Sequence, residues 1–453
     1  MLKKILSYGG LEAVAKGLNR SLFLILPLFL PISIYGKVGI IAAAELLLPM
    51  LSMLGFDRAI LRFYHEKENY SLFTSSIFCA ITLAQLFLFL VFGILVLFFD
   101  INLIFGLDAF PDLFLLLIDV YLLNLIQVFL NIQRVEENHK SYFSIRLLFQ
   151  IVKFVFVIVF FLFFKDEISY LLGVFSACLI VILMNFKRIV AKFNFKFSKT
   201  TLKFMILFCW PFVFHSIASN LLGTVDRFIL ESYVSLNEIG VYTFVYSIAS
   251  SLSFAYQGVS VYLEPRIYNS STKKQQENRL SYYLYFTIFA GSIAFVFLVI
   301  ASIWLIPLYF PEYESGINMI PIIGFGQLFM PFYFYSNYRL MVNKKPFSIA
   351  KVSVLSAIVN IILLFVLIPI YGVYAAAISV FISLFFLGFF ILLLSNSFKI
   401  TSGFNFIIIL AVLFSLLIFL SINSLYFIGV FCVASYSLFK LLKLNSLVAD
   451  GID

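Results

Sequence analysis

Fourteen apolar stretches, each long enough to cross a lipid bilayer, make up almost the whole chain. A helix rises about 1.5 Å per residue, so roughly 20 apolar residues span a hydrocarbon core about 30 Å thick. The loops between the stretches are short, and none is long enough to form a soluble domain. The sequence therefore predicts an all-α polytopic membrane protein of about 14 transmembrane helices, acting within or across the membrane.

The expected helices occupy 8–34, 38–58, 71–99, 110–133, 142–164, 168–186, 203–230, 238–263, 281–308, 316–342, 347–370, 372–395, 403–421 and 425–441. Composition agrees with this reading. Hydrophobic residues make up 63% and charged residues 12% of the chain, whereas soluble domains average about 45–50% and 25%. The net charge of +9 is carried largely by short loops such as 187–203. We interpret these bases as topology signals and expect no nucleic-acid partner.

Loop charge alternates along the chain when these helices are threaded through a bilayer. One set of loops, including 187–203, holds most of the Lys and Arg residues, and the other, including 100–112, holds most of the acids. Basic loops face the cytoplasm. Both termini are therefore expected to be cytoplasmic.

Cysteine and histidine give no sign of a metal or redox site. The four cysteines, none in a Cys-x-x-Cys spacing, lie in apolar runs, and the three histidines are scattered. Buried structural thiols are the expected reading. The sequence thus predicts neither a metal site nor a cofactor.

A weak internal repeat suggests two halves. Residues Ile34–Ile40 are read as a turn after the first helix, and a similar pattern at Ser235–Val241 follows the seventh helix. Six-helix repeats are a transporter plan. We therefore expect an N-terminal six-helix lobe at 1–200, a C-terminal lobe at 201–398, and helices 13 and 14 with a cytoplasmic tail at 399–453.

Several short motifs carry a family resemblance. Asp226–Leu230 followed by Asn237–Tyr242, together with Leu54–Ile60 and Ile368–Val373, is similar to bacterial Wzx-type polysaccharide (O-antigen) flippases. These belong to the multidrug/oligosaccharidyl-lipid/polysaccharide exporter superfamily. The resemblance implies a V-shaped, MATE-like pair of six-helix lobes around a central cavity. It also implies export of an undecaprenyl-pyrophosphate-linked oligosaccharide from the cytoplasmic to the outer leaflet, with a polysaccharide polymerase and a chain-length regulator as possible partners.

Ionisable and amide side chains inside the spans give the candidate site. A charge at a helix centre costs about 2.5–3.5 kcal/mol on insertion scales, so such residues should face a bundle interior or a wet cavity. Basic residues outnumber acids there, which suits a pyrophosphate. The candidate substrate-binding residues are Arg20, Lys16, Arg227, Lys153, Arg58, Asn220 and Gln257, and Glu12, Asp57 and Asp226 are candidates for structural or coupling roles.

Each candidate also has a purely structural interpretation. Lys16 can pair with Glu12 one turn away, and Lys153 can extend its ammonium to the membrane surface. Arg227 can anchor a helix end, because Asp226, its neighbour in the chain, is expected to point elsewhere. Asn220 and Gln257 can join helices rather than bind sugar.

Other functions remain open at this stage. A flippase for capsular, teichoic or peptidoglycan precursors differs mainly in cargo. A membrane polymerase or glycosyltransferase would need larger outward loops than the 100–112 loop, and a drug-cation antiporter would need unpaired carboxylates in the lumen. We therefore expect a transporter and not an enzyme.

Overall fold

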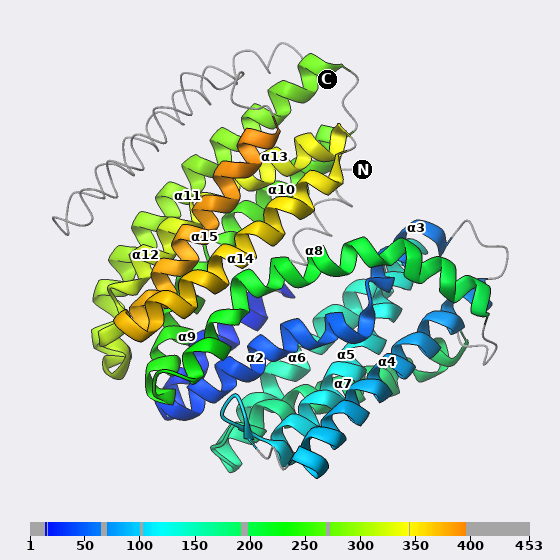
Figure 1. Ribbon diagram of the computed structural model, residues 1–453, viewed down its shortest axis with the longest axis horizontal. Coiled ribbons are helices and arrows are strands. Elements are labelled where there is room, and N and C mark those ends of the chain that lie inside the picture. The colour runs from blue at the N-terminus through cyan, green and yellow to red at the C-terminus, as the bar shows by residue number, and fades with distance from the viewer. Residues whose placement is uncertain are drawn as a thin grey trace. The chain divides into compact units, whose positions relative to one another are not determined.

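The computed structural model describes residues 14–15, 17–64, 70–99, 103–191, 198–268, 272–343 and 345–395, and a few of these by their backbone alone. Helices expected at 403–421 and 425–441 lie outside the described residues. The described chain is almost entirely helical (Figure 1). The prediction of an all-α polytopic membrane protein is therefore confirmed.

Contacts divide the chain into two compact units, one formed by Val14–Phe244 and the other containing the described residues from Val245 onward. The lobe boundary expected at residue 200 stays a prediction. After the apolar helix Gly17–Leu28, the first unit contains α2 (Ile32–Met53), α3 (Phe56–Phe63), α4 (Tyr70–Phe99), a hairpin of β1 (Leu103–Ile104) and β2 (Leu107–Asp108), a π-helical turn (Ala109–Leu113), α5 (Phe114–Val135), α6 (His139–Phe163), α7 (Ile168–Ala191), α8 (Lys199–Glu231) and the first part of α9 (Leu236–Ser250).

The second unit contains the end of α9, α10 (Ser253–Tyr268), α11 (Lys273–Tyr309), a 3-10 turn (Pro311–Gly316), α12 (Met319–Gln327), α13 (Met330–Val342), α14 (Pro346–Tyr371) and α15 (Val373–Leu394). Eight helices of the described chain are long and apolar enough to cross a membrane: Ile32–Met53, Leu72–Phe99, Ala109–Val135, Lys140–Phe163, Ile168–Ala191, Lys273–Tyr309, Phe347–Tyr371 and Val373–Leu394. The protein is thus a multi-pass membrane protein.

Three expected helices are each broken in two. The 38–58 helix ends at Leu54 and Gly55, whose φ angles of 50° and 72° are left-handed and stop a right-handed helix. In the 238–263 helix, the Ser251 hydroxyl donates to the Ile248 carbonyl at 2.6 Å, a side-chain bond that competes with the helix ladder. The 316–342 helix breaks before Pro331, which has no backbone N–H to donate.

The turn expected at Ile34–Ile40 is wrong: these residues form the first turns of α2, which starts directly after Pro31. The matching segment opens α9. A Cβ on Gly36 would lie under 3.0 Å from the Leu236 carbonyl, and a Cβ on Gly240 equally close to the Ile32 carbonyl. The two repeated segments therefore cross each other reciprocally, and glycine at each position lets the backbones meet.

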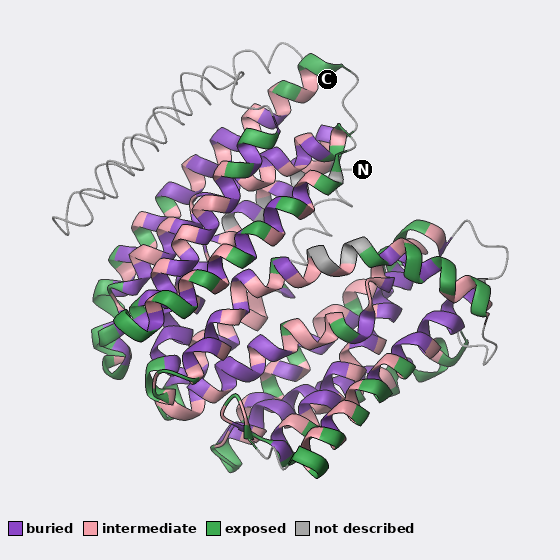
Figure 2. Cartoon of the chain, in the orientation of Figure 1, coloured by how far each residue is buried: buried purple, intermediate pink, exposed green. Residues whose placement is uncertain are grey.

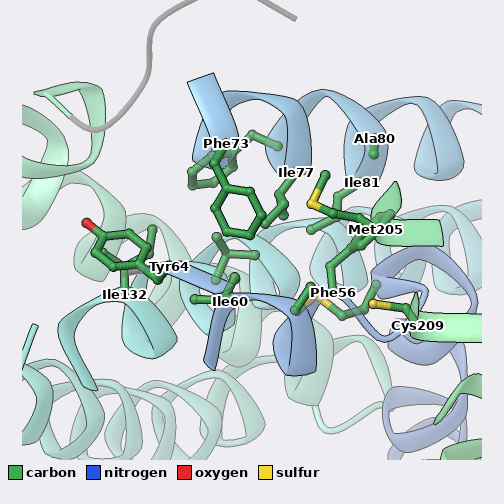
Figure 3. Packing of buried hydrophobic residues seen from close by; sticks show 14 residues of the cluster. Phe56, Ile60, Tyr64, Phe73, Ile77, Ala80, Ile81, Ile132, Met205 and Cys209 are labelled. Carbon is green, nitrogen blue, oxygen red and sulfur yellow. The ribbon is translucent and has the colours of Figure 1, made fainter. Parts of the chain in front are cut away.

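The core of the first unit forms where α3, α4, α5 and α8 meet. Its buried side chains interdigitate in Figure 3, and they include Phe56, Phe73, Ile132 and Met205. In the second unit, a cluster rich in aromatic side chains joins α10, α11 and α13, with Tyr283, Tyr335 and Phe332 buried in it. Each unit thus has its own apolar core.

Lipid-facing surface is clearest on α4. Only 11% of its apolar window is buried, and Leu83, Phe87 and Leu97 are exposed. Figure 2 shows exposed residues along this helix. Exposed apolar side chains in the later part of this span suit hydrocarbon and not water. The face of α4 that packs inward joins the core of the first unit.

Candidate functional site

A cluster of ionisable side chains lies buried inside the first unit. Lys153 of α6 donates to the Tyr170 hydroxyl of α7 at 2.8 Å and lies 3.4 Å from Glu45 Oε2 of α2. The Tyr170 hydroxyl donates to the same Glu45 oxygen at 2.9 Å. The Lys153 ammonium also lies 4.6 Å from the centre of the Tyr170 ring. Three helices therefore meet at one ammonium, one hydroxyl and one carboxylate.

A second carboxylate lies beside this group. Asp119 of α5 is completely buried, and neither of its carboxylate oxygens has a hydrogen-bond partner among the described residues. The charges of Glu45 and Lys153 both act on it. One oxygen of Glu45 is likewise buried without a partner in the described chain. The buried charge cluster, defined here as Glu45, Asp119, Lys153 and Tyr170, therefore holds two acids and one base.

Local helix packing explains why the cluster forms. A Cβ on Gly173 would overlap Val157, so α6 and α7 approach most closely at this pair. Val157 lies one turn beyond Lys153, and Gly173 lies about one turn beyond Tyr170. The close approach of the two helices therefore brings Lys153 and Tyr170 together.

The charge balance determines what the buried charge cluster can do. An ionised carboxylate buried without donors is very costly, so such a group takes up a proton or binds a cation or water. With one ammonium for two acids, the cluster can gain and lose one positive charge while its lysine stays paired. This arrangement suits the exchange of a proton or a small cation inside the membrane.

The sequence reasoning singled out Lys153 but missed Glu45 and Asp119. Lys153 is 6% exposed and paired with Glu45, so its ammonium does not extend into solvent. Each of the two acids stands alone within an apolar run, and this signal was missed. The runs are Ala43-Ala44-Glu45-Leu46 in α2 and Leu117-Ile118-Asp119-Val120 in α5. An intramembrane acid is by itself a functional-site signal.

Arg227 also has a partner. Its guanidinium lies 3.4 Å from Asp226 Oδ1 and donates to the Gly223 carbonyl at 3.0 Å. Tyr242 of α9 donates to the other Asp226 oxygen. The expectation that Asp226 points away from Arg227 is therefore wrong, because the side chains of these consecutive residues turn toward each other. Both are buried, and together with Tyr242 they link α8 to α9.

The N-terminal candidates are only partly described. Arg20 lies half-buried in the helix Gly17–Leu28. Lys16 and Glu12 lie outside the described residues, and of Gln257 in α10 only the backbone is described.

Two further candidates have local partners. Asn220 of α8 is half-buried and donates to the Ser216 carbonyl at 2.9 Å and to the Met50 sulfur at 3.3 Å. Arg58 Nε lies 3.5 Å from Asp57 Oδ2, and the two side chains are 53% and 35% exposed. Exposed pairs of this kind contribute little to stability. Asn220 therefore joins α8 to α2, while Arg58 keeps an accessible charge at the start of α3.

A protein-family model described as "Polysaccharide biosynthesis protein" matches residues 1–267. This match covers more than half of the chain. The chain belongs to the polysaccharide biosynthesis protein family. All four residues of the buried charge cluster lie within the matched part. Among the curated proteins, no sequence matches the chain.

Solved structures with this fold are titled as flippases or transporters. A lipid II flippase MurJ in an inward closed conformation has a TM-score of 0.71 at 15% identity, covering 96% of this chain and 98% of that chain. An inward-facing multidrug resistance MATE family transporter of the MOP superfamily has a TM-score of 0.65 at 13% identity, covering 85% and 94%. The MATE multidrug transporter DinF-BH, solved as a complex, has a TM-score of 0.61 at 15% identity, covering 87% and 95%. At these identities the likeness shows the fold, which is the MATE-like fold that the sequence motifs imply.

Proposed function

We propose that this member of the polysaccharide biosynthesis protein family is a flippase for undecaprenyl-pyrophosphate-linked oligosaccharide repeat units of the O-antigen type. It would move them from the cytoplasmic to the outer leaflet of a bacterial inner membrane by alternating access, with both termini cytoplasmic. The family match is the observation that carries the proposal. The multi-pass fold, which is similar to solved flippase and transporter structures, supports movement of a cargo across the membrane. The finer choice of an O-antigen unit rests on the motif resemblance.

The anionic head group of the cargo needs bases that can bind phosphate. Lys153 and Arg227 are held by acids. We assign the pyrophosphate to Arg20 and Lys16, the candidate bases of the N-terminal segment. Arginine can meet phosphate oxygens with two parallel hydrogen bonds. We assign Asn220 and Gln257 to the sugar hydroxyls, and Arg58 to the cytoplasmic approach of the head group. Glu12, Asp57 and Asp226 are assigned structural roles beside these bases.

The buried charge cluster supports a driven transport cycle. Asp119 and Glu45 each keep a carboxylate oxygen without a partner in the described part of the chain. Binding and release of a cation there would change the charge inside the first unit. We assign this cluster to energy coupling and the bases near Arg20 to cargo. A polysaccharide polymerase and a chain-length regulator are the proposed downstream partners.

The test is glycan export in a bacterium that lacks its own repeat-unit flippase. Arg20→Ala should abolish surface glycan while the protein stays inserted and abundant. Arg20→Lys should restore part of the export, because the charge remains but the two-pronged geometry is lost. Arg188→Ala is the matched control, since Arg188 is an exposed arginine at the end of α7. Export at the wild-type rate by Arg20→Ala would show that Arg20 does not hold the pyrophosphate.

The likeness to the lipid II flippase favours a second candidate, export of a peptidoglycan precursor. The two candidates share the lipid carrier and differ in the sugar. Rescue of a strain depleted of its lipid II flippase, without rescue of O-antigen export, would select the second candidate. The opposite pattern would select the first.

A further inference from the structure

Three carboxylates converge at one end of the first unit. Asp108 ends the β1–β2 hairpin, Asp112 lies in the π-helical turn that follows, and Glu167 directly precedes α7. One oxygen from each lies within 4.8 Å of the others. Asp112 and Glu167 are 1% and 7% exposed, whereas Asp108 is exposed. The group is thus largely enclosed but open to solvent on the Asp108 side.

A lysine already occupies part of this group. Lys37 of α2 forms an ion pair with Glu167, and the charges of Asp108 and Asp112 also act on its ammonium. Three carboxylates and one ammonium leave a net charge of −2. The group therefore attracts cations, and one divalent ion would balance its charge.

The carboxylate of Asp112 provides an independent sign of a missing ligand. Its Oδ2 accepts from the Asp108 backbone N–H at 3.3 Å. Its Oδ1 is buried, with no hydrogen-bond partner among the residues that the structure describes. A buried carboxylate oxygen normally has a donor or a cation beside it. A cation between the three carboxylates would supply what this oxygen lacks.

Three carboxylates favour calcium over magnesium, because magnesium dehydrates reluctantly and is usually held by only one or two carboxylates. Calcium binds oxygen at 2.3–2.6 Å, so two ligands on opposite sides of the ion are about 4.6–5.2 Å apart. Three oxygens within 4.8 Å of one another are therefore close enough to share one calcium ion.

We propose that Asp108, Asp112 and Glu167 form a calcium-binding site. The ion would take over from Lys37 as the counter-charge of Glu167 and would tie the β1–β2 hairpin to the start of α7. These acids lie in loops that the charge pattern assigns to the outside of the membrane. Sites that face the outside typically bind calcium with dissociation constants of about 10⁻⁴–10⁻³ M. The sequence predicted no metal site, because the three acids span some sixty residues and match no metal motif.

The experiment measures thermal unfolding and equilibrium calcium binding of the full-length protein in detergent after treatment with a chelator. Calcium at about 10 mM should raise Tm and saturate at one ion per chain, and magnesium at the same concentration should do so less. Asp108→Asn should weaken calcium binding about tenfold, since one charged ligand is lost. Asp166→Asn is the matched control, because Asp166 directly precedes Glu167 but accepts a hydrogen bond from the Ser169 hydroxyl.

Lys37→Gln separates a metal site from a simple ion pair. It removes the competing ammonium and leaves three carboxylates, so calcium should bind more tightly than in the wild type. It also keeps the proposal testable if Asp108→Asn fails to fold. Absence of saturable calcium binding in both the wild type and Lys37→Gln would overturn the proposal. Equal binding by the wild type and Asp108→Asn would also overturn it.

Discussion

Replacing Lys153 with methionine tests whether the buried charge cluster is an electrostatic unit. The Lys153 and Glu45 side chains are 7% and 9% exposed, so water cannot replace the lost ammonium. Removing one partner of a buried ion pair typically costs about 3–5 kcal/mol, because the remaining charge is uncompensated. Here the loss leaves two carboxylates, Glu45 and Asp119, with no base beside them in the described cluster. We therefore expect the upper part of that range.

The double variant Glu45→Gln with Lys153→Met isolates the charge effect. It removes the pair together and should recover most of the stability, since replacing both members of a buried pair is often close to neutral. The difference between the double variant and the sum of the single variants gives the coupling energy. Arg58→Met is the matched control for loss of a paired base. The Arg58–Asp57 pair is largely exposed, so its loss should cost no more than about 1 kcal/mol.

The assay is thermal unfolding of the detergent-solubilised protein, followed by helical circular dichroism. A loss of this size should lower Tm by on the order of 10 °C in a unit of this length. Lys153→Met with an unchanged Tm would refute the reasoning. A double variant no more stable than Lys153→Met would also refute it, because lost packing would then explain the effect.

Two further predictions concern the fold. Gly240→Ala should destabilise the protein by about 1–3 kcal/mol, because the added Cβ would collide with the Ile32 carbonyl. Gly93→Ala is the control and should not destabilise the protein, because open space surrounds Gly93. Equal unfolding midpoints for the two variants would contradict the close contact between the two repeated segments. Reporter fusions after Lys199 and after Asp108 should report opposite sides of the membrane, as the loop charges predict; matching sides would defeat the predicted topology.

The helices could be predicted from the sequence because long apolar runs are sufficient to define them. The breaks within them could not, because they depend on local backbone geometry. Leu54 adopts a left-handed conformation that leucine rarely takes, and only the following glycine hinted at it. The turn expected at 34–40 failed for a related reason. Gly36 and Gly39 were interpreted as turn residues, whereas they allow α2 to approach α9.

The candidate site could be predicted only in part. Charge within a span indicated Lys153 and Arg227 as functional, and both are buried. Their partners were missed because pairing across helices depends on which faces meet, and one sequence does not contain that information. Lys153 meets Glu45 across 108 residues of chain. A count of bases and acids therefore overestimated how many cations are available to a cargo.

The central claim is that this protein moves a lipid-linked oligosaccharide across a membrane, and flipping in reconstituted vesicles tests it most directly. The purified full-length chain would be placed in vesicles with an undecaprenyl-pyrophosphate-linked oligosaccharide that carries a fluorescent sugar label. A membrane-impermeant quencher then reports which leaflet holds the label. We predict that the wild type makes the label of both leaflets accessible to the quencher. We also predict that Arg20→Ala slows the loss of fluorescence from the inner-leaflet label. Label that stays protected in the inner leaflet, as in protein-free vesicles, would contradict the account.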